Sequence, residues 1–170
     1  MSRFPRVAFL ALLPMAAPAQ EQPQPARSAF VHLGAAKLDP GAGSFTPVLE
    51  AGYPVLQWGL TCLGVFAGGT QWRRGRFSAG EVSPSSLLDK TALWAGAYTS
   101  GAFWSVGLAA EYGTQQIYVT PTPANNYFNG VDQSRSGVGL FLGLHGQSGF
   151  GAFVRMGSQS GIGCGVSFHF

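Results

Sequence analysis

The sequence predicts an all-β fold, an antiparallel up-and-down transmembrane β-barrel with eight strands as the preferred count. Three observations lead to this prediction. Hydrophobic residues make up 46% of the 170 residues and charged residues only 10%, whereas a soluble surface carries roughly 25–35% charged residues. The 25 glycines all follow residue 19, so the rest of the chain far exceeds the usual level of about 7%. Several segments alternate apolar residues with small or polar ones, which is the period of a β-strand.

Residues 1–19 are predicted to be a secretory signal peptide. Arg3 and Arg6 form a basic start, an apolar run reaches Leu13, and residues 17–19 form a small-residue cleavage site, as such signals have. The apolar run is too short for a membrane-spanning helix, which needs about 20 residues. The chain is therefore expected to be exported.

The segment 20–27 is polar and rich in proline, and it is predicted to be a short disordered lead-in to a single domain over 28–170. Loss of the signal leaves eight basic residues (10 − 2) against seven acidic ones. The alkaline isoelectric point therefore does not indicate nucleic-acid binding, and no nucleic-acid partner is expected.

The last predicted strand, 161–170, shows the alternation most clearly. Its even-numbered residues are apolar, and its odd-numbered residues are glycine, serine or histidine. Segments 104–112 and 137–145 follow the same pattern. A soluble sheet would carry charged residues on its second face, whereas a barrel in lipid turns large apolar residues outward and fills a narrow interior with small ones. Closure also leaves no free strand edge in the membrane.

Turn residues divide the domain into its strands. The strands are predicted, in order, at about 28–38, 45–54, 58–76, 87–99, 102–118, 133–145, 149–158 and 161–170. The connections are predicted at 39–43, before 58, at 78–86, 99–101, 121–131, 146–148 and 158–161. The even count places both ends of the chain on one side and the longest loops on the other, as bacterial barrels require.

Gly68-Gly69 could be a hairpin turn, which would give nine strands, but a bend within one strand is preferred. About ten residues cross the apolar band of an outer membrane, so 58–76 and 102–118 are expected to project beyond it. An aromatic girdle at the opposite interface is expected from Tyr53, Trp58, Trp104 and Phe170.

With its final aromatic pattern, Val166-x-Phe168-x-Phe170, the chain resembles the small outer-membrane β-barrels of Gram-negative bacteria, of the outer-membrane protein A and X type. The resemblance covers the whole mature chain in architecture. It implies an outer-membrane location, lipid and lipopolysaccharide as partners, and recognition of Val166, Phe168 and Phe170 as an assembly signal by the barrel-assembly machinery. No cofactor is expected.

Three ionisable residues fall on the inward face of their strands, namely Glu50, Glu111 and Arg155. A buried charge is costly unless it is paired, so these residues are predicted to form an interior ion network. A gate or proton path is the alternative function for the same residues.

His32, His145 and His169 also face inward, but they are expected at different heights, and no metal site is predicted. Ser167 beside His169, or Ser148 near His145, leaves open a lipid A-modifying hydrolase, which needs a nucleophile in contact with a base. The preferred interpretation is that these side chains fill the interior, so no catalytic residue is predicted.

Arg73, Arg74 and Arg76 cluster where the third strand leaves the membrane. Arginine suits phosphate geometry, so these residues are predicted to contact lipopolysaccharide, with a solvated loop entry as the alternative. Cys62 and Cys164 are expected to be free, buried thiols, the latter on the lipid side.

The function that the sequence favours is a non-enzymatic structural or surface-interaction role, in envelope stability or adhesion. Loops 77–87 and 119–132 are expected to contact any extracellular ligand. The alternatives are a narrow channel, a lipid A-modifying enzyme and a secreted soluble β protein.

Overall fold

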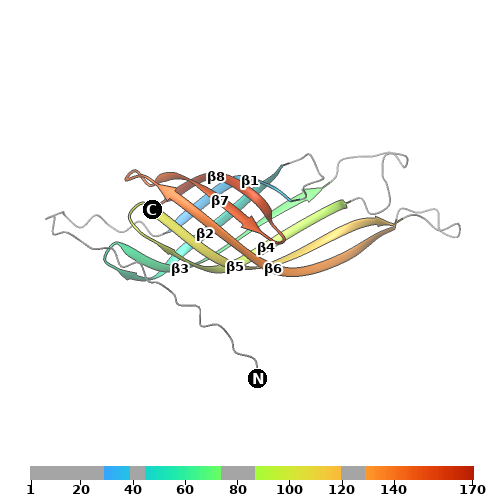
Figure 1. Ribbon diagram of the computed structural model, residues 1–170, viewed down its shortest axis with the longest axis horizontal. Helices are drawn as coiled ribbons and strands as arrows, with labels where there is room; N and C mark the ends of the chain where they lie inside the picture. The colour runs from blue at the N-terminus through green and yellow to red at the C-terminus, as the bar shows by residue number, and fades with distance from the viewer. Residues whose placement is uncertain (1–28, 39–44, 74–86, 120–128) are drawn as a thin grey trace, which may run out of the picture.

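The computed structural model describes residues 29–38, 45–73, 87–119 and 129–170, and these residues form eight strands and no helix. The strands are β1 (Phe30–Lys37), β2 (Thr46–Trp58), β3 (Thr61–Arg73), β4 (Leu87–Ser100), β5 (Trp104–Val119), β6 (Asn129–His145), β7 (Phe150–Gly157) and β8 (Gly161–His169). Each strand pairs antiparallel with the next, and β8 pairs with β1 to close a barrel (Figure 1). The predicted all-β class, strand count and up-and-down topology are therefore confirmed.

The predicted signal peptide and lead-in lie outside the described residues. No helix in the described ranges is long and apolar enough to cross a membrane.

The barrel has a turn end and a loop end. The turn end carries the short connections 59–60, 101–103 and 146–149, together with the start of β1 and the end of β8. At the loop end, β6 begins ten residues before its last pair with β7, which joins Gly139 to Gly157 (139 − 129 = 10). Strands β4, β5 and β6 therefore run past β7 and β8 at this end (Figure 1). β5 is about as long as predicted for 102–118, and β6 begins four residues before its predicted start.

The strands tilt steeply around the barrel axis. Paired residues followed once around the barrel, from Gly137 on β6 through Glu50 on β2, return to β6 at His145, a shift of eight residues (145 − 137 = 8). For eight strands spaced about 4.8 Å apart with a rise of about 3.3 Å per residue, this shift gives a tilt of roughly 35°. A barrel of this size has room inside only for side chains.

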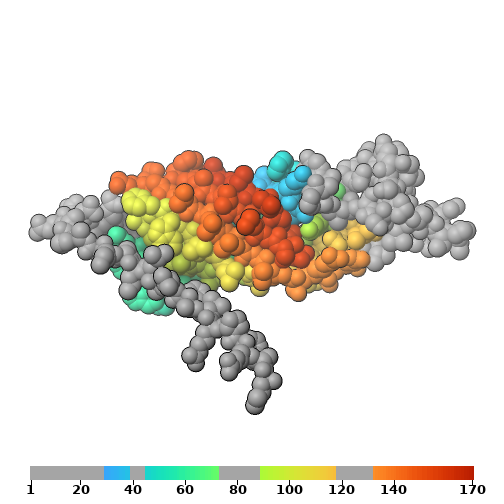
Figure 2. All heavy atoms as spheres, viewed as in Figure 1, coloured from blue at the N-terminus to red at the C-terminus, as the bar shows by residue number. Residues whose placement is uncertain are grey.

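Large apolar side chains cover most of the outer wall, whereas the charged side chains of Glu50, Glu111 and Arg155 are buried inside the barrel. Every strand carries at least one exposed large apolar residue on its outer face: Leu33, Leu49, Val65, Leu93, Leu108, Leu142, Val154 and Ile162 are 46–67% exposed. The inward residues at alternate positions are mostly buried. In the space-filling view the side chains of β6 to β8 form a continuous wall (Figure 2). The expected inside-out arrangement follows directly from the two-residue period.

The hairpin between β2 and β3 differs from the prediction. The turn is at Gly59-Leu60, so Trp58 ends β2 and does not open β3. Gly59 has a φ of 57°, a conformation that glycine adopts without strain. The pairing of β2 shifts between Pro54 and Leu56, because proline has no amide hydrogen to give to the ladder. Because of this irregularity, the last residues of β2 do not follow the alternating pattern from which the strand was predicted.

Gly68 and Gly69 lie in the middle of β3, where pairing with β2 and β4 continues without a shift of register. The nine-strand alternative is therefore wrong. A Cβ atom at Gly68 would meet the side chains of Glu50 and Trp94 and the carbonyl oxygen of Leu49. Glycine at this position makes room for the interior side chains of the two neighbouring strands.

Gly68→Ala is accordingly expected to lower the free energy of unfolding by about 1–3 kcal/mol, the usual effect of overpacking. Gly146→Ala serves as the matched control, because a Cβ there would meet only ordinary contacts at 3.8 Å. Urea unfolding in detergent measures both variants. Equal stability of the two variants would contradict the packing role of Gly68.

Candidate functional site

The structure brings Glu50, Glu111 and Arg155 together on the barrel axis from strands β2, β5 and β7. One terminal nitrogen of Arg155, Nη1, donates to Glu50 Oε2 at 2.7 Å, and the other, Nη2, donates to Glu111 Oε1 at 2.8 Å. All three side chains are at most 2% exposed. One guanidinium thus links two carboxylates from different walls, in the charge-assisted geometry that makes the strongest hydrogen bonds.

The turn between β7 and β8 closes this network on the side of Glu111. Backbone amides of Gln159 and Ser160 donate to Glu111 Oε2 at 2.7 and 3.2 Å. The Ser160 hydroxyl donates to Glu111 Oε1 at 2.5 Å and accepts a hydrogen bond from Arg155 Nε at 3.1 Å. The sequence predicts this segment only as a turn, and nothing in its composition shows that the backbone folds inward over a carboxylate.

Glu50 has two further partners. Its Oε2 accepts a hydrogen bond from Trp94 Nε1 at 2.8 Å, and its Oε1 lies 2.7 Å from His32 Nδ1. The guanidinium carbon of Arg155 lies 3.8 Å from the centre of the Trp94 ring, a cation–π contact. The two carboxylates thus face one guanidinium, and of the two only the carboxylate of Glu50 contacts the His32 ring. His32 is predicted to face inward, and the same inward parity on its strand is the signal in the sequence that could have identified Trp94.

An aromatic layer fills the interior between this network and the turn end. The His32 ring stacks on Phe30 at 4.2 Å and on Phe153 at 4.4 Å between ring centres. Phe141 packs edge-on against Phe30 and Phe66. These rings are at most 3% exposed, so the barrel is filled at this level.

The expectation that the three histidines lie at different heights is wrong. His145 and His169 stack with ring centres 3.9 Å apart, and His32 is 6.0 Å from His169. The eight-residue shift around the barrel places His145 on the same row of paired residues as His32, with Gly151 and Ser167 between them. Each row is inclined to the barrel axis by the tilt of the strands, so the positions of residues along their own strands do not show which rings meet. Within the described ranges, no group of three or more His, Cys, Asp or Glu side chains is arranged to hold a metal ion.

Ser167 lies directly across from His32 on the neighbouring strand, and His32 contacts Glu50. Serine, histidine and glutamate are the residue types of an acyl-transfer triad. However, Ser167 Oγ and His32 Nε2 have no hydrogen-bond partner among the described residues, and the side chains are 0–1% exposed. A nucleophile must contact its base and its substrate, so this geometry favours interior packing.

The predicted assembly residues lie on the outer face of β8. Val166 is 38% exposed and Phe170 is 70% exposed. The Phe168 ring packs edge-on against Phe150 on β7, with ring centres 5.4 Å apart. The three side chains therefore form an accessible apolar stripe on the last strand.

Both cysteines are free, as predicted. Cys62 is buried, with its sulfur 2.9 Å from Ser100 Oγ. Cys164 is exposed on the outer wall, because its parity is that of the apolar face. The expected burial thus holds for Cys62 and not for Cys164.

The remaining predicted sites are largely outside the description. Arg73 ends β3, but its side chain is not described, and Arg74 and Arg76 lie beyond it. Loops 77–87 and 119–132 are described only at their ends, over 87, 119 and 129–132.

Comparison of the chain with models of protein families, with curated proteins and with solved structures finds no match.

Proposed function

We propose that the chain is an integral outer-membrane β-barrel without enzymatic activity, which presents its loop end at the cell surface in a structural or interaction role. The observation that carries the proposal is the apolar outer wall, with exposed large apolar residues on all eight strands and the ionised network inside. The largest apolar patch of a soluble monomer is typically only about 300–600 Å². An apolar outer wall of this extent is favourable in contact with lipid and unfavourable in contact with water.

The height of the apolar wall supports a membrane position. On the outer face of β5, Trp104 and Tyr112 are eight residues apart, which is about 26 Å along the strand and about 22 Å along the axis at the tilt given above. The apolar band of an outer-membrane barrel is about 25 Å tall and is bordered by aromatic residues. Tyr53, Trp58 and Phe170, all exposed, lie with Trp104 near the turn end.

The filled interior favours a plug over the alternative, a narrow channel. Arg155, Glu50 and Glu111 join three walls, and the rings of Phe30 and Phe141 fill the next layer. Reconstituted protein is therefore expected to give no conductance steps in a planar bilayer, whereas a channel would give them.

The loop end is the part of the barrel suited to interaction. Strands β4 to β6 continue beyond the interior network, and the segments 77–87 and 119–132 join them there. Arg73, Arg74 and Arg76 adjoin the same end and would contact phosphates of lipopolysaccharide. The stripe of Val166, Phe168 and Phe170 would serve recognition by the barrel-assembly machinery.

Labelling on intact cells tests this orientation. In a Cys62→Ser/Cys164→Ser background, Ser134→Cys on the outer face of β6 is expected to react with a membrane-impermeant thiol reagent. Gln147→Cys, in the turn after β6 at the opposite end, should react only after the outer membrane is permeabilised. Equal labelling of the two sites on intact cells would contradict the proposal.

A further inference from the structure

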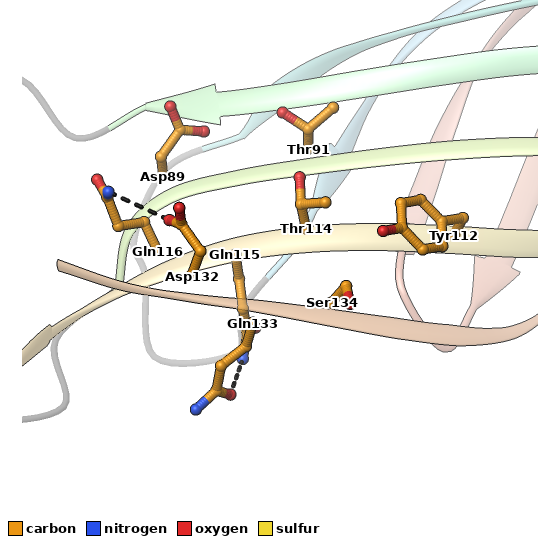
Figure 3. Close-up of a pocket in the computed structure, with 9 residues that line it drawn as sticks. All are labelled: Asp89, Thr91, Tyr112, Thr114, Gln115, Gln116, Asp132, Gln133 and Ser134. Carbon is orange, nitrogen blue, oxygen red and sulfur yellow. Dashed lines mark hydrogen bonds between the residues drawn. The ribbon is translucent and has the colours of Figure 1, made fainter.

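A polar pocket of about 500 Å³ lies on the outer wall near the loop end of β4, β5 and β6. Two rows of directly paired residues line it. The first row is Asp89, Gln116 and Asp132, and the second is Thr91, Thr114 and Ser134. Figure 3 shows these side chains across three adjacent strands, with Gln115 and Gln133 directed to the opposite side.

The chemistry of the two rows suits a sugar. The row of hydroxyl groups can donate and accept, and the other row offers carboxylates and an amide. Gln116 Nε2 donates to Asp132 Oδ1 at 3.2 Å, which holds the amide and the carboxylate side by side. Groups on neighbouring strands are about 4.8 Å apart, the scale of a pyranose ring. The exposed carboxylate of Asp132 disfavours an anionic group such as phosphate, because like charges repel.

Tyr112 adds a flat apolar surface to the same pocket. Its side chain is 53% exposed, and it lies on the outer face of β5, two residues from Thr114. An aromatic ring that is apolar on its face and polar at its hydroxyl suits contact with a sugar, which has apolar C–H faces and polar edges. Leu93, paired with Tyr112 on β4, is exposed next to it.

The position of the pocket indicates which sugar. If the proposed membrane location holds, on which this inference rests, Tyr112 marks the upper border of the apolar band, and the pocket lies at the level of the lipid head groups. We infer that the pocket binds the uncharged sugar head group of an outer-leaflet glycolipid, whose acyl chains lie along the apolar wall below. This ligand and this site differ from those proposed above for the loops 77–87 and 119–132 and for the arginine cluster.

Equilibrium binding to detergent-solubilised protein tests the inference, in a detergent without sugars. The probe is a glycolipid with an uncharged disaccharide head group on diacylglycerol, compared with the diacylglycerol that carries the same acyl chains and no sugar. Tyr112→Leu/Gln116→Ala is expected to weaken binding of the sugar-bearing lipid about tenfold, which is about 1.4 kcal/mol. The matched control is Tyr53→Leu/Gln57→Ala, which makes the same replacements at the opposite border and should leave binding unchanged.

Three outcomes overturn the inference: equal binding by both double variants, equal binding of the two lipids by the unmodified protein, or binding of the free uncharged disaccharide as tight as that of the intact glycolipid. Insertion into vesicles by flotation is measured first for all variants. Failure of the unmodified protein to insert would reject the proposed function and this inference together. Insertion without a difference between the variants would reject only the inference.

Discussion

Arg155→Met should lower the free energy of unfolding by about 3–5 kcal/mol, the effect of removing one partner from a buried ion pair. Methionine keeps much of the volume of arginine, but it leaves the carboxylates of Glu50 and Glu111 without their guanidinium. Both carboxylates are buried, so neither can regain hydration without opening the barrel. Denaturant unfolding in detergent measures the loss.

The matched variant removes all three charges. Glu50→Gln/Glu111→Gln/Arg155→Met is expected to recover at least half of the stability lost in the single variant. The three replaced side chains are uncharged, so none of them needs a buried counter-charge. Glutamine can still accept the hydrogen bonds from Trp94 and from the turn at Ser160. A single variant within about 1 kcal/mol of the unmodified protein, or no recovery in the triple variant, would contradict the role of Arg155 as the central counter-charge.

Leu108→Arg should destabilise the protein by about 2–4 kcal/mol in a lipid bilayer, the effect of arginine at the bilayer midplane. Leu108 is 64% exposed on the outer face of β5 and lies midway between Trp104 and Tyr112. The control, Thr114→Arg, is on the same face of the same strand but beyond Tyr112, where the expected effect is about 0–1 kcal/mol. Reversible unfolding in phosphatidylcholine vesicles measures both.

The difference in destabilisation between Leu108→Arg and Thr114→Arg distinguishes a lipid-facing wall from a water-facing one. An exposed arginine on a water-facing wall is nearly neutral wherever it lies, since surface changes are usually within about 0.5 kcal/mol. Equal and small effects at Leu108 and Thr114 would therefore place the apolar wall in water and not in lipid.

The two-residue period predicted most of the fold. It located all eight strands, the closed topology and the face on which Glu50, Glu111 and Arg155 lie. It failed where the backbone departs from the period. At Pro54 the ladder shifts by one residue, so the end of β2 and the position of Trp58 were misplaced.

Contacts across the barrel could not be obtained from single strands. Which inward residues meet depends on the eight-residue shift around the barrel, and that shift is a property of all eight pairings together. His145 and His32 share a row only because of it. The inward fold of the turn at Gln159 and Ser160 depends in the same way on the position of Glu111, which lies 48 residues before Gln159 in the chain.

The mobility of boiled and unboiled protein on a detergent gel, with protein recovered from outer-membrane fractions, tests the central claim most directly. A closed barrel with all backbone groups paired resists detergent until it is heated. The account predicts recovery in the outer-membrane fraction and a clear shift in mobility on boiling. Recovery in the soluble periplasmic fraction with no shift would contradict it and would assign the alternating strands to a soluble fold.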